Sequence, residues 1–598
     1  MSSSILSASD QKLLVTTSLE STWGNDEYLL LLGEWCEIHE RRHVLNERRH
    51  EVASFHWDDR NKLKRDYDYL QQLHHKLLQN LTDSLNNFHN VEYSLRSWQV
   101  LLDPWLMSYI SVLFDRWEAL RLVFEKNESI QTILPNKPQS RETPFSYNEL
   151  ISQTQSDEWN FLLYSYIIEN YYLDRCMILN KEIQFSEKNE LPQSSGWNHR
   201  KVLEKVSTFV DTILGLFSSH YKVVFLSSCF SVNSLVKLSL TIRQMPRLFL
   251  KYFKYFDVRT EIDIIPLDRS KLSVQFEPQN QFENFLKEII VSDIPVSVVE
   301  AFNSLSEHAS KLKIKTKAIV TAGEHWGDIF AKFWFVDQLK KGVKLVVLEH
   351  GGSFPAFKEL FNFEEDIADI RGTWFLPYHE KHVKVPPSKL INKYDTKIKK
   401  KHIRKYCSCI GSEQFRWVCR VHFYPMTAQC LTSFNWVLAM YSALNEDVKK
   451  QFKVKPYPNV GWDTKAMYEN ALGTEHIAYD NKLDDVFYAS KVIVCTYPET
   501  TFSEAMMTGI PTILLYPEEL YERNPVAYPL LDLLREAKLI FHDPGAAAKH
   551  LNSIWTNPDD WWNSPIVLNA RAQFTNQAIS NDVNWLDHWK EFVNQVIG

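Results

Sequence analysis

Residues 491–516 read KVIVCTYPETTFSEAMMTGIPTILLY and decide the fold class. The opening run KVIVCTY is apolar and β-branched, as a buried strand is, and PTILLY at the end is a second run of that kind. Between them, Thr501 and Glu504 have the T-x-x-E spacing of a helix capping box, and Gly509 stands where a helix would end. The stretch predicts a strand, a short helix and a second strand, the alternation that builds parallel α/β sheets.

The same alternation begins near residue 222. Short β-branched runs end in small or polar residues and alternate with helical stretches, as parallel strands covered on both faces do. The other runs are KVVFLSS from residue 222, KAIVTAG from 317 and VKLVVLEHGG from 343. Open sheets of this kind bind ligands beyond the carboxyl ends of their strands.

The first third of the chain has a different pattern. The segment QKLLVTTSLE at 11–20 predicts one strand, whereas residues 26–125 carry apolar and aromatic side chains at three- and four-residue steps. That periodicity predicts long helices. Residues 127–145 and 184–197 are polar and contain proline, so we expect both segments to be loops.

The length of 598 residues exceeds the ~250 to 300 that one core supports, which favours two or more domains. A lysine-rich stretch at 394–406 is the predicted boundary, because strand and helix alternation occurs on both sides of it. We predict an α/β protein with two Rossmann-like domains facing a cleft. The first would span residues 1–393 and include a large helical insertion at about 26–220, and the second would span 394–598.

The composition of the chain limits the binding partners and the cellular compartment that we expect for it. The net charge of −7 argues against nucleic-acid binding, which needs a basic face. The eight cysteines are scattered and the N-terminus is polar, so we expect a reducing cytoplasm. No apolar run reaches the ~18 residues of a membrane span, and any membrane contact would be peripheral, at the inner membrane. The basic run at 394–406 is either a solvated linker or a contact to anionic lipid or a phosphate-bearing acceptor.

The helix predicted after KVIVCTY is a candidate anion site. A helix that starts at the carboxyl end of a parallel strand presents free N–H groups and a positive dipole end. Thr500, Thr501 and Ser503 could add hydroxyl donors to a phosphate, and Glu504 could accept hydrogen bonds from ribose. The alternative is an ordinary capped helix with no ligand.

The segment TTFSEAMMTGIPTILLY resembles the donor-binding segment in the C-terminal half of GT-B glycosyltransferases. Most of the chain, from about residue 12 to 575, also resembles a narrower family, the surface-polysaccharide transferases of O-antigen and capsule clusters first named from a Leptospira locus. The stretches that carry this resemblance are LLVTTSLESTWG, WDDRNKLKRDYDYL, DPWLMSYISVLFDRW, LEHGGSF, KPYPNVGW and NPDDWW. The resemblance implies a GT-B fold and a donor site in the second domain. The chain has Glu349 where that family has glutamine.

Two strand ends in the first domain carry further candidates. His350, Gly351 and Gly352 follow VVLE, where glycines would let the backbone approach a ligand and His350 could bind phosphate or transfer a proton. Glu324 follows the strand before it and is a second acid or base candidate. The alternatives are a tight turn at the glycines and a structural role for Glu324.

Three more candidates are Lys455 and Tyr457 in the second predicted domain and Glu20 near the N-terminus. In KPYPNVGW, Lys455 and Tyr457 lie on a proline-shaped loop, where Lys455 could add positive charge to the donor phosphate. Glu20 follows the first predicted strand and is the acid or base candidate for the acceptor hydroxyl. A solvated lysine and a surface carboxylate are the corresponding alternatives.

We expect no metal and no cofactor beyond the nucleotide-sugar co-substrate. Paired aspartates occur at 58, 484 and 559 in helical or loop contexts that look like caps. Cys407 and Cys409 lack the paired spacing of a zinc module. GT-B enzymes, which the chain resembles, neutralise the leaving phosphate with helix ends and cations.

The resemblance implies a glycosyltransferase that moves a sugar onto a lipid-linked or oligosaccharide acceptor of the cell surface. Similarity to transferases of Kdo and other nonulosonic acids favours a CMP-activated donor over a UDP-sugar. Two alternatives use the same cleft: a non-catalytic nucleotide- or glycan-binding component of an assembly complex, and a nucleotide-sugar isomerase. The acceptor, the linkage, the stereochemistry and the oligomeric state are not encoded in any motif that we identify.

Overall fold

The computed structural model describes residues 12–25, 27–127, 129–136, 140–183, 185, 208–215, 220–253, 258–352, 354–391, 404–478, 482–580 and 584–598. Their named strands form three five-stranded sheets. Every pairing within these sheets is parallel. The predicted α/β class is therefore confirmed, with one sheet more than we expected.

The N-terminal sheet has the strand order β3-β2-β1-β4-β5. The chain starts in the centre of this sheet at β1, which is the strand predicted at 11–20, and builds outward in both directions. The order therefore reverses between β1 and β4. The strands are β1 (Lys12–Val15), β2 (Tyr28–Leu31), β3 (His50–Val52), β4 (Ile130–Pro135) and β5 (Cys176–Lys181).

The middle sheet has the order β10-β9-β8-β7-β6, so each strand pairs with the next one along the chain. Residues 223–226 and 318–321 are fully buried, as the continuous β-branched runs predicted. The strands are β6 (His220–Leu226), β7 (Lys315–Thr321), β8 (Lys344–Leu348), β9 (Ile370–Thr373) and β10 (His382–Lys384).

The C-terminal sheet has the order β12-β11-β13-β14-β15. Here the order reverses between β11 and β13, and such a reversal leaves a crevice for ligands beyond the strand ends. The stretch quoted first supplies β13, α19 (Thr500–Thr508) and β14, as predicted. The strands are β11 (Tyr406–Ile410), β12 (Phe452–Lys455), β13 (Ser490–Cys495), β14 (Thr512–Leu515) and β15 (Ile540–Phe541).

The helical insertion predicted at about 26–220 is instead most of a third α/β unit. Residues 26–125 do contain two long helices, α2 (Arg60–His89) and α3 (Leu95–Lys126), but the short strands β2 and β3 precede them. The loop predicted at 127–145 contains β4, whose six residues are all buried. The polar and proline residues around IQTILP concealed a central strand. The segment predicted as a loop at 184–197 lies, except for residue 185, outside the described residues, as does the proposed boundary between 393 and 394.

The two long helices have clear start signals. The carboxylate of Asp59 accepts hydrogen bonds from the N–H groups of Asn61 and Lys62 at the start of α2. The hydroxyl of Ser94 accepts one from Ser97 N–H at the start of α3. Aspartate and serine side chains of this kind satisfy N–H groups that have no partner within the helix. Almost all of α3 is buried, because it packs against α2, α13 and α14.

The other helices cover the three sheets and connect their strands. They are α1 (Arg42–Asn46), α4 (Tyr147–Thr154), α5 (Asp157–Tyr171), α7 (Val232–Thr241), α8 (Leu250–Phe253), α9 (Val258–Glu261), α10 (Gln281–Asp293), α11 (Phe302–Ser310), α12 (Glu324–Gly327), α13 (Ile329–Lys340), α14 (Phe363–Ile367), α15 (Leu431–Ser442), α16 (Glu446–Lys449), α17 (Thr464–Leu472), α18 (Leu483–Ala489), α20 (Tyr528–Glu536), α21 (Pro544–Ile554), α22 (Pro558–Trp562), α23 (Pro565–Phe574) and α24 (Trp585–Ile597).

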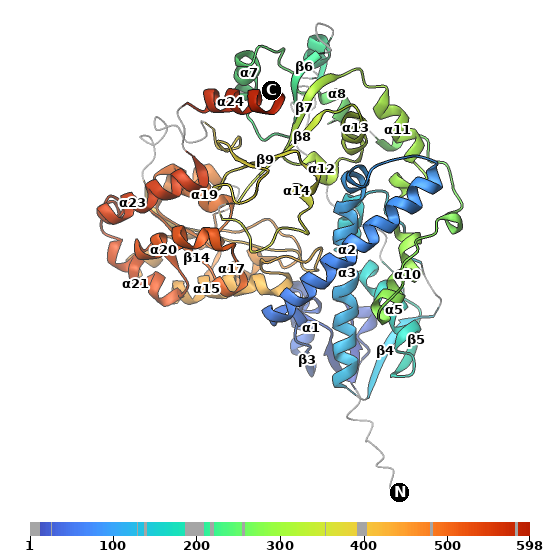
Figure 1. Cartoon of the computed structure of the whole chain (residues 1–598). Coiled ribbons are helices and arrows are strands. Elements are labelled where there is room, and N and C mark those ends of the chain that lie inside the picture. The colour runs from blue at the N-terminus through green and yellow to red at the C-terminus, as the bar shows by residue number, and fades with distance from the viewer. Residues whose placement is uncertain are drawn as a thin grey trace.

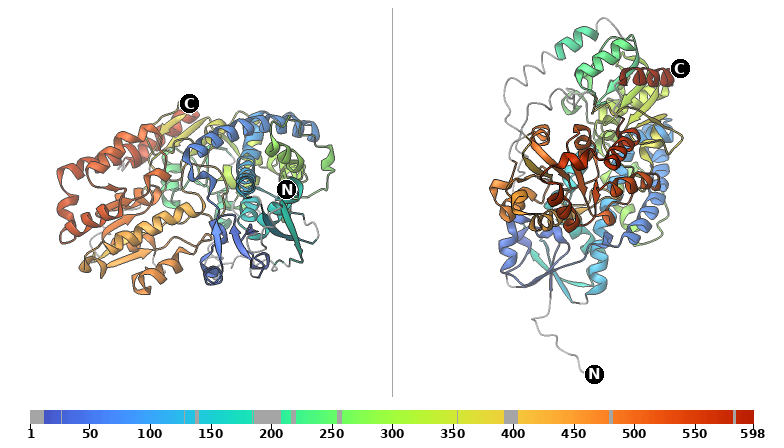
Figure 2. Two further views of the ribbon diagram at one scale, coloured as in Figure 1. Left: turned by 90° about the horizontal axis from the view of Figure 1, so that it is seen from below. Right: turned by 90° about the vertical axis from the view of Figure 1, so that its left-hand side faces the viewer.

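The three units lie side by side. In Figure 1 the C-terminal unit, orange and red, lies beside a column formed by the green middle unit and the blue N-terminal unit, and the two further views in Figure 2 agree with this arrangement. The last helix, α24, leaves the C-terminal unit and packs on β6, β7 and α7 of the middle unit (Figure 1). Its buried Trp589 donates a hydrogen bond to the carbonyl of Pro386 at 3.1 Å. The first predicted domain, residues 1–393, thus contains two sheets instead of one, and the second of these belongs to the middle unit that contacts the C-terminal unit.

Candidate active site

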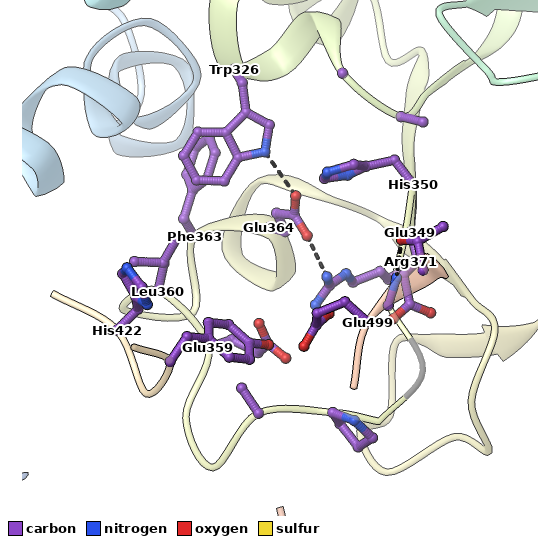
Figure 3. A pocket seen from close by; sticks show the side chains of 18 of the residues that line it. Trp326, Glu349, His350, Glu359, Leu360, Phe363, Glu364, Arg371, His422 and Glu499 are labelled. Atoms are coloured by element: carbon purple, nitrogen blue, oxygen red, sulfur yellow. Dashed lines mark hydrogen bonds and ion pairs between the residues drawn. The ribbon is translucent and has the colours of Figure 1, made fainter. Parts of the chain in front are cut away.

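A cavity of about 630 Å³ lies where the carboxyl ends of β6, β7 and β8 face the start of α19, and we call it the central cavity. Figure 3 shows its side chains pointing inward from both units. The middle unit contributes Ser227, Cys229, Ala322, Gly323, Trp326, Glu349, His350, Gly351, Gly352, Phe354, Pro355, Ala356, Lys358, Glu359, Leu360, Phe363, Glu364, Glu365 and Arg371. The C-terminal unit contributes Arg420, His422, Tyr424, Glu499 and Thr500.

The predicted glycine turn is the point where the two units touch. The N–H group of Gly352, whose φ is +120°, donates a hydrogen bond to Thr500 Oγ1 at 2.9 Å. A Cβ atom on Gly351 would lie 2.3 Å from the same oxygen. We predicted that the glycines allow a close approach to a ligand, whereas in this structure they allow a close approach to α19.

Helix α19 starts two residues earlier than a helix capped by Thr501 would. Its N-cap is Glu499, and no side chain caps it. The hydroxyls of Thr501 and Tyr497 are hydrogen-bonded to each other, so the capping box with Glu504 does not form. The helix ends at Gly509 in the left-handed conformation, φ +69°, as predicted.

The predicted donor-binding residues of this helix separate in the structure. Thr500 lines the central cavity, and Thr501 and Ser503 are buried beneath it. The hydroxyl of Ser503 donates to the carbonyl of Gly352 at 3.4 Å. Glu504 is buried and lies 3.4 Å from Lys389 Nζ, so its side chain is not on the cavity wall where a ribose would contact it.

Three other predicted residues lie outside the central cavity. Lys455 ends β12 at the edge of its sheet, and Tyr457 follows it with 39% of its surface exposed. Neither is among the described residues that line the central cavity. Glu20 begins a short 3₁₀ helix after β1 and is exposed, with an ion pair to Arg41 at 3.1 Å. The structure does not bring Glu20 to His350, because β1 and β8 belong to different sheets.

Glu324 lies behind the cavity wall rather than in it. Its carboxylate accepts a hydrogen bond from the hydroxyl of Ser227, which does line the cavity. The N–H group of Glu324 donates to Thr321 Oγ1 at 3.1 Å. These contacts give Glu324 the structural role that was its alternative, with access to the cavity through Ser227.

The segment that follows β11 also lines the cavity and was not predicted from any motif. Arg420, His422 and Tyr424 line the cavity, whereas Val421 and Phe423 between them are fully buried. This alternation in RVHFY is the signal that could have placed the three polar side chains on one face. The Arg420 guanidinium lies 5.5 Å from the Trp326 ring and forms no salt bridge with any residue that the structure describes.

Arg420 and His422 differ in charge. Burial would lower the pKa of Arg420, but neighbouring groups, Tyr147 first, raise it overall, so the guanidinium stays protonated. Burial and the positive charge of Arg420 lower the pKa of His422 to about 3. His422 is therefore neutral at pH 7, and Arg420 is the cation of this face.

The N-terminal unit holds this segment in place. Arg416 donates hydrogen bonds to Ser18 Oγ and to the carbonyl of Trp35, both at 2.9 Å, and to Asp157 at 2.6 Å. The ring of Trp417 lies 5.1 Å from that of Trp35. These contacts hold Arg416 and Trp417 against the loops that follow β1 and β2.

A second arginine reaches the same segment from α3. The guanidinium of Arg116 is fully buried and donates to the carbonyl of Val418 at 3.1 Å. It also pairs with Asp115, whose other oxygen is bonded to His56 at 2.9 Å. Two arginines thus fix the backbone a few residues before Arg420.

The middle unit places a charged network in the wall of the cavity (Figure 3). Arg371 forms ion pairs with Glu364 and Glu365. His325 and Trp326 donate toward Glu364 at 3.0 and 2.9 Å. Burial would raise the pKa of Glu364, but Arg371 and His325 lower it overall, so this carboxylate stays ionised.

Two carboxyl groups on the wall titrate close to neutral pH, and the pKa of His350 is lowered. Burial raises the pKa values of Glu349 and Glu359 to about 7 each. The protein atoms around His350 strip water from the ring and lower its pKa below the usual 6.5, an effect that Glu364 opposes. At pH 7 His350 is neutral and able to accept a proton.

The positive end of the α19 dipole is not neutralised by the carboxylate of its N-cap residue, because that carboxylate is paired with an arginine. The carboxylate of its N-cap, Glu499, is paired with Arg523 at 3.0 Å, and burial raises the pKa of that carboxyl. The carbonyl of Glu499 accepts from Phe502 N–H, and the N–H groups before Phe502 have no partner within the helix. The tip and Arg420 therefore offer two positive features to one anion, at the reversal point between β11 and β13.

Two smaller cavities adjoin the central one. A cavity of about 360 Å³ shares Tyr147, Arg420, His422, Tyr424 and Glu499 with it and extends into the C-terminal unit. A cavity of about 440 Å³ shares Ala356, Lys358, Glu359 and Glu365 with it and extends along the middle unit. The two smaller cavities share no lining residue with each other. The central cavity thus lies between them.

Within the described ranges, no group of three or more histidine, cysteine, aspartate or glutamate side chains is arranged to hold a metal ion. The cysteines are all free, and Cys407 and Cys409 are buried in β11. In the same ranges, no helix has both the length and the apolar character needed to cross a bilayer.

The family described as LIC12162 family transferase matches residues 12–593. No curated protein matches the chain. Solved structures similar to it include MurG of Acinetobacter baumannii at 12% identity, covering 63% of this chain and 100% of that one, with a TM-score of 0.31. MnaA of S. aureus with UDP has 11% identity, coverage of 62% and 97%, and a TM-score of 0.33. Anabaena Alr3699/HepE in complex with UDP and glucose has 11% identity, coverage of 63% and 100%, and a TM-score of 0.34.

Proposed function

The chain belongs to the LIC12162 family of transferases, and from this membership we propose that it moves a glycosyl group from a nucleotide-sugar donor to a glycan acceptor in the central cavity. The observation that carries the proposal is the position of Arg420. Its guanidinium forms no salt bridge with any residue that the structure describes, although Glu364 is among the groups that raise its pKa, and it lines the same cavity as the tip of α19. A donor phosphate between them would gain two charge-assisted contacts.

The nucleoside fits the cavity of about 360 Å³ next to Arg420. Its wall carries the rings of Tyr497, Tyr521 and Phe415, on which a flat base can stack, and the amide of Gln414, which can donate and accept hydrogen bonds. Donor binding residues would then come from the C-terminal unit, as we expected, but from segments other than Lys455 and Tyr457.

The reaction would take place beside His350. The acceptor hydroxyl oxygen attacks the anomeric carbon, the bond from that carbon to the phosphate oxygen breaks, and the electron pair leaves on the phosphate. His350 takes the hydroxyl proton, because its lowered pKa keeps it neutral before the step. The Glu364 carboxylate favours the imidazolium that forms. Arg420 and the tip of α19 stabilise the developing phosphate charge.

The donor that we propose is a CMP-activated nonulosonic acid such as Kdo or a sialic-type sugar. The described residues place two guanidinium groups in the central cavity, and that of Arg371 is paired with Glu364 and Glu365. Arg420 and one helix tip therefore suit the single phosphate of such a donor, whereas a UDP-sugar brings two phosphates. We propose that the acceptor is a cell-surface glycan, either lipid-linked or a free oligosaccharide. The free state of the cysteines supports transfer in the cytoplasm or at the inner membrane surface, where peripheral contact would occur.

A thermal-shift panel of CMP, UDP, GDP and their sugar conjugates tests the proposal, because a ligand that binds the native state raises its apparent stability. We expect one nucleotide class to stabilise the chain. Arg420→Gln should lose about 1.5 to 3 kcal/mol of binding free energy, or roughly 10- to 150-fold in affinity. Arg42→Gln removes an exposed arginine far along the chain and should bind as the wild type does. Equal affinities in the two variants would remove the phosphate site.

His350→Asn separates a transferase from a non-catalytic binding protein. Asparagine keeps a polar side chain but cannot take up a proton near neutral pH. We expect unchanged nucleotide binding and a loss of transfer of about 10²- to 10⁴-fold. Turnover of the donor alone, without an acceptor, would instead indicate the isomerase alternative.

A further inference from the structure

The cavity of about 440 Å³ has no role in donor binding as proposed above. Its position next to the central cavity suggests a different role. It shares lining residues with the central cavity but none with the nucleoside cavity. It reaches the central cavity through Ala356, Lys358, Glu359 and Glu365, which line both. The three cavities are therefore connected in series. The nucleoside cavity adjoins the central cavity, which would hold the phosphate and the sugar, and the central cavity adjoins the cavity of about 440 Å³, which we call the third compartment.

The lining of this third compartment suits a polyhydroxylated ligand. It offers amide groups from Gln71 and Asn524, a carboxylate from Asp366 and a cation from Lys381, so hydroxyl groups would find both donors and acceptors. The ring of Tyr378 gives a face against which the apolar side of a sugar can pack. Aliphatic side chains such as leucine, isoleucine and valine are missing from the described residues of this wall, which disfavours a lipid tail.

Glu359 stands where the two compartments meet. The hydroxyl of Tyr67 donates to its carbonyl and accepts the N–H group of Phe361 at 3.0 Å, which fixes the backbone on both sides of it. The carboxylate accepts a hydrogen bond from Tyr378 at 3.3 Å and lines the central cavity with its neighbours (Figure 3). A hydroxyl passing from one compartment to the other would meet this carboxylate.

We propose that the third compartment binds the glycan portion of the acceptor, and that Glu359 orients the acceptor hydroxyl toward the donor sugar. This inference rests on the proposed function and adds an acceptor site to it. His350 remains the group that takes the proton, so no further covalent step is required. The lipid carrier of a lipid-linked acceptor would stay outside, beyond the β9–β10 loop.

Two neighbouring glutamines of α2 provide a matched test. Gln71 lines the third compartment and is half-buried, whereas Gln72 is exposed and lines no cavity described here. Both variants, Gln71→Ala and Gln72→Ala, keep good helix formers on the same helix, so neither should unfold the chain. The assay uses the full chain, the nucleotide-sugar from the panel, and as probe the oligosaccharide released from the surface glycan of cells that encode the protein.

We expect Gln71→Ala to raise the KM for the oligosaccharide about tenfold, with the donor KM and the nucleotide-induced stabilisation unchanged. Gln72→Ala should match the wild type. Hydrogen exchange of the nucleotide-loaded wild type should slow at residues 67–71 and 378–381 when the oligosaccharide is added. Intact lipid-linked glycan should protect the same residues if the glycan portion alone is recognised.

Two results would overturn the inference without touching the donor site. One is an equal oligosaccharide KM in the two glutamine variants. The other is nucleotide binding to the wild type with no protection at 67–71 and 378–381. A wild type that binds no nucleotide at all would instead contradict the proposed function, and the thermal-shift panel reports that outcome separately.

Discussion

Glu349 and Glu359 bring two carboxyl groups into a cavity that we propose for an anion. Burial raises the pKa of each to about 7, so both are partly protonated at neutral pH. A protonated carboxyl adds no negative charge next to the phosphate. These residues therefore reduce the electrostatic cost of donor binding, which ionised carboxylates would increase.

Donor binding should take up protons near neutral pH. The bound phosphate disfavours ionised Glu349 and Glu359 and raises their pKa values further above about 7. Affinity should therefore be highest below pH 7, where both are already protonated, and should fall as the pH rises through 7 to 8. Calorimetry at pH 7 in two buffers of different ionisation enthalpy measures the uptake.

The matched variant for this experiment is Glu349→Gln with Glu359→Gln. It mimics the protonated form of both side chains and should bind the donor without proton uptake. A binding enthalpy that does not depend on the buffer in the wild type would contradict the predicted linkage.

At the level of single residues, the sequence located part of the site. His350, Gly351, Gly352 and Thr500 were predicted from strand ends and do line one cavity. Strand ends are visible in a sequence because apolar runs stop there. Arg420 was missed because it lies ten residues beyond β11, in a segment without a helix or strand of its own.

Between elements, the contact of α19 with the glycine turn joins the middle and C-terminal units. Thr500 Oγ1 accepts the Gly352 N–H group, and Gly351 leaves the room that this oxygen needs. The carbonyl of Gly352 also accepts from Ser503. The tip that we propose for phosphate binding is thus positioned by a turn from the opposite wall.

Gly351→Ala and Thr500→Ala should not be additive. The alanine Cβ atom would lie 2.3 Å from Thr500 Oγ1, so the hydroxyl must turn away and lose its bond to Gly352. We expect each single variant to cost about 1 kcal/mol of stability, and the double variant to cost little more than either one. Chemical denaturation of the four proteins measures this. A double variant that is destabilised by the full sum of the two would show that the residues act independently.

Some strands and helices could be predicted from the sequence, whereas the strands β3 and β4 could not. The strand, helix and strand of 491–516 were found because both strands are buried on both faces and their apolar runs are uninterrupted. Strand β3 is only half-buried and reads HEV, which gives no such signal. Strand β4 is fully buried, but its threonine and glutamine made the segment look like a loop.

At the level of the whole molecule, the N-terminal unit holds in place the segment of the C-terminal unit that carries Arg420. The crevice beyond β1 is the place where a sheet of this order would bind a ligand. Here Arg416 contacts Ser18, which follows β1, and Trp417 contacts Trp35, which follows β2. Two sheets were expected instead of three because the helical periodicity of α2 and α3 dominates the first third of the sequence and conceals the short strands around them.

Asp157→Asn should loosen the segment that carries Arg420. The carboxylate accepts hydrogen bonds from Arg416 at 2.6 Å and from Ser18 Oγ at 2.7 Å, and asparagine lacks the charge that holds the guanidinium. We expect faster hydrogen exchange at 416–422 and an affinity for the nucleotide that is lower by roughly 5- to 30-fold, about 1 to 2 kcal/mol.

The control for this variant is Asp174→Asn, which removes an exposed carboxylate of the same unit. It should leave both the exchange at 416–422 and the nucleotide affinity unchanged. Identical exchange in the two aspartate variants would mean that the N-terminal unit does not hold the segment.

Because α24 packs on the middle unit, proteolytic cleavage between the middle and C-terminal units should not separate the two fragments. Residues 585–597 end the sequence, yet Trp589, Phe592 and Val596 belong to the core of the middle sheet. A protease nick between residues 391 and 404 would therefore not release the C-terminal part, since its tail would stay docked on the other fragment. The cleaved protein should elute as one species in native size-exclusion chromatography, and as two fragments after a denaturant has released α24.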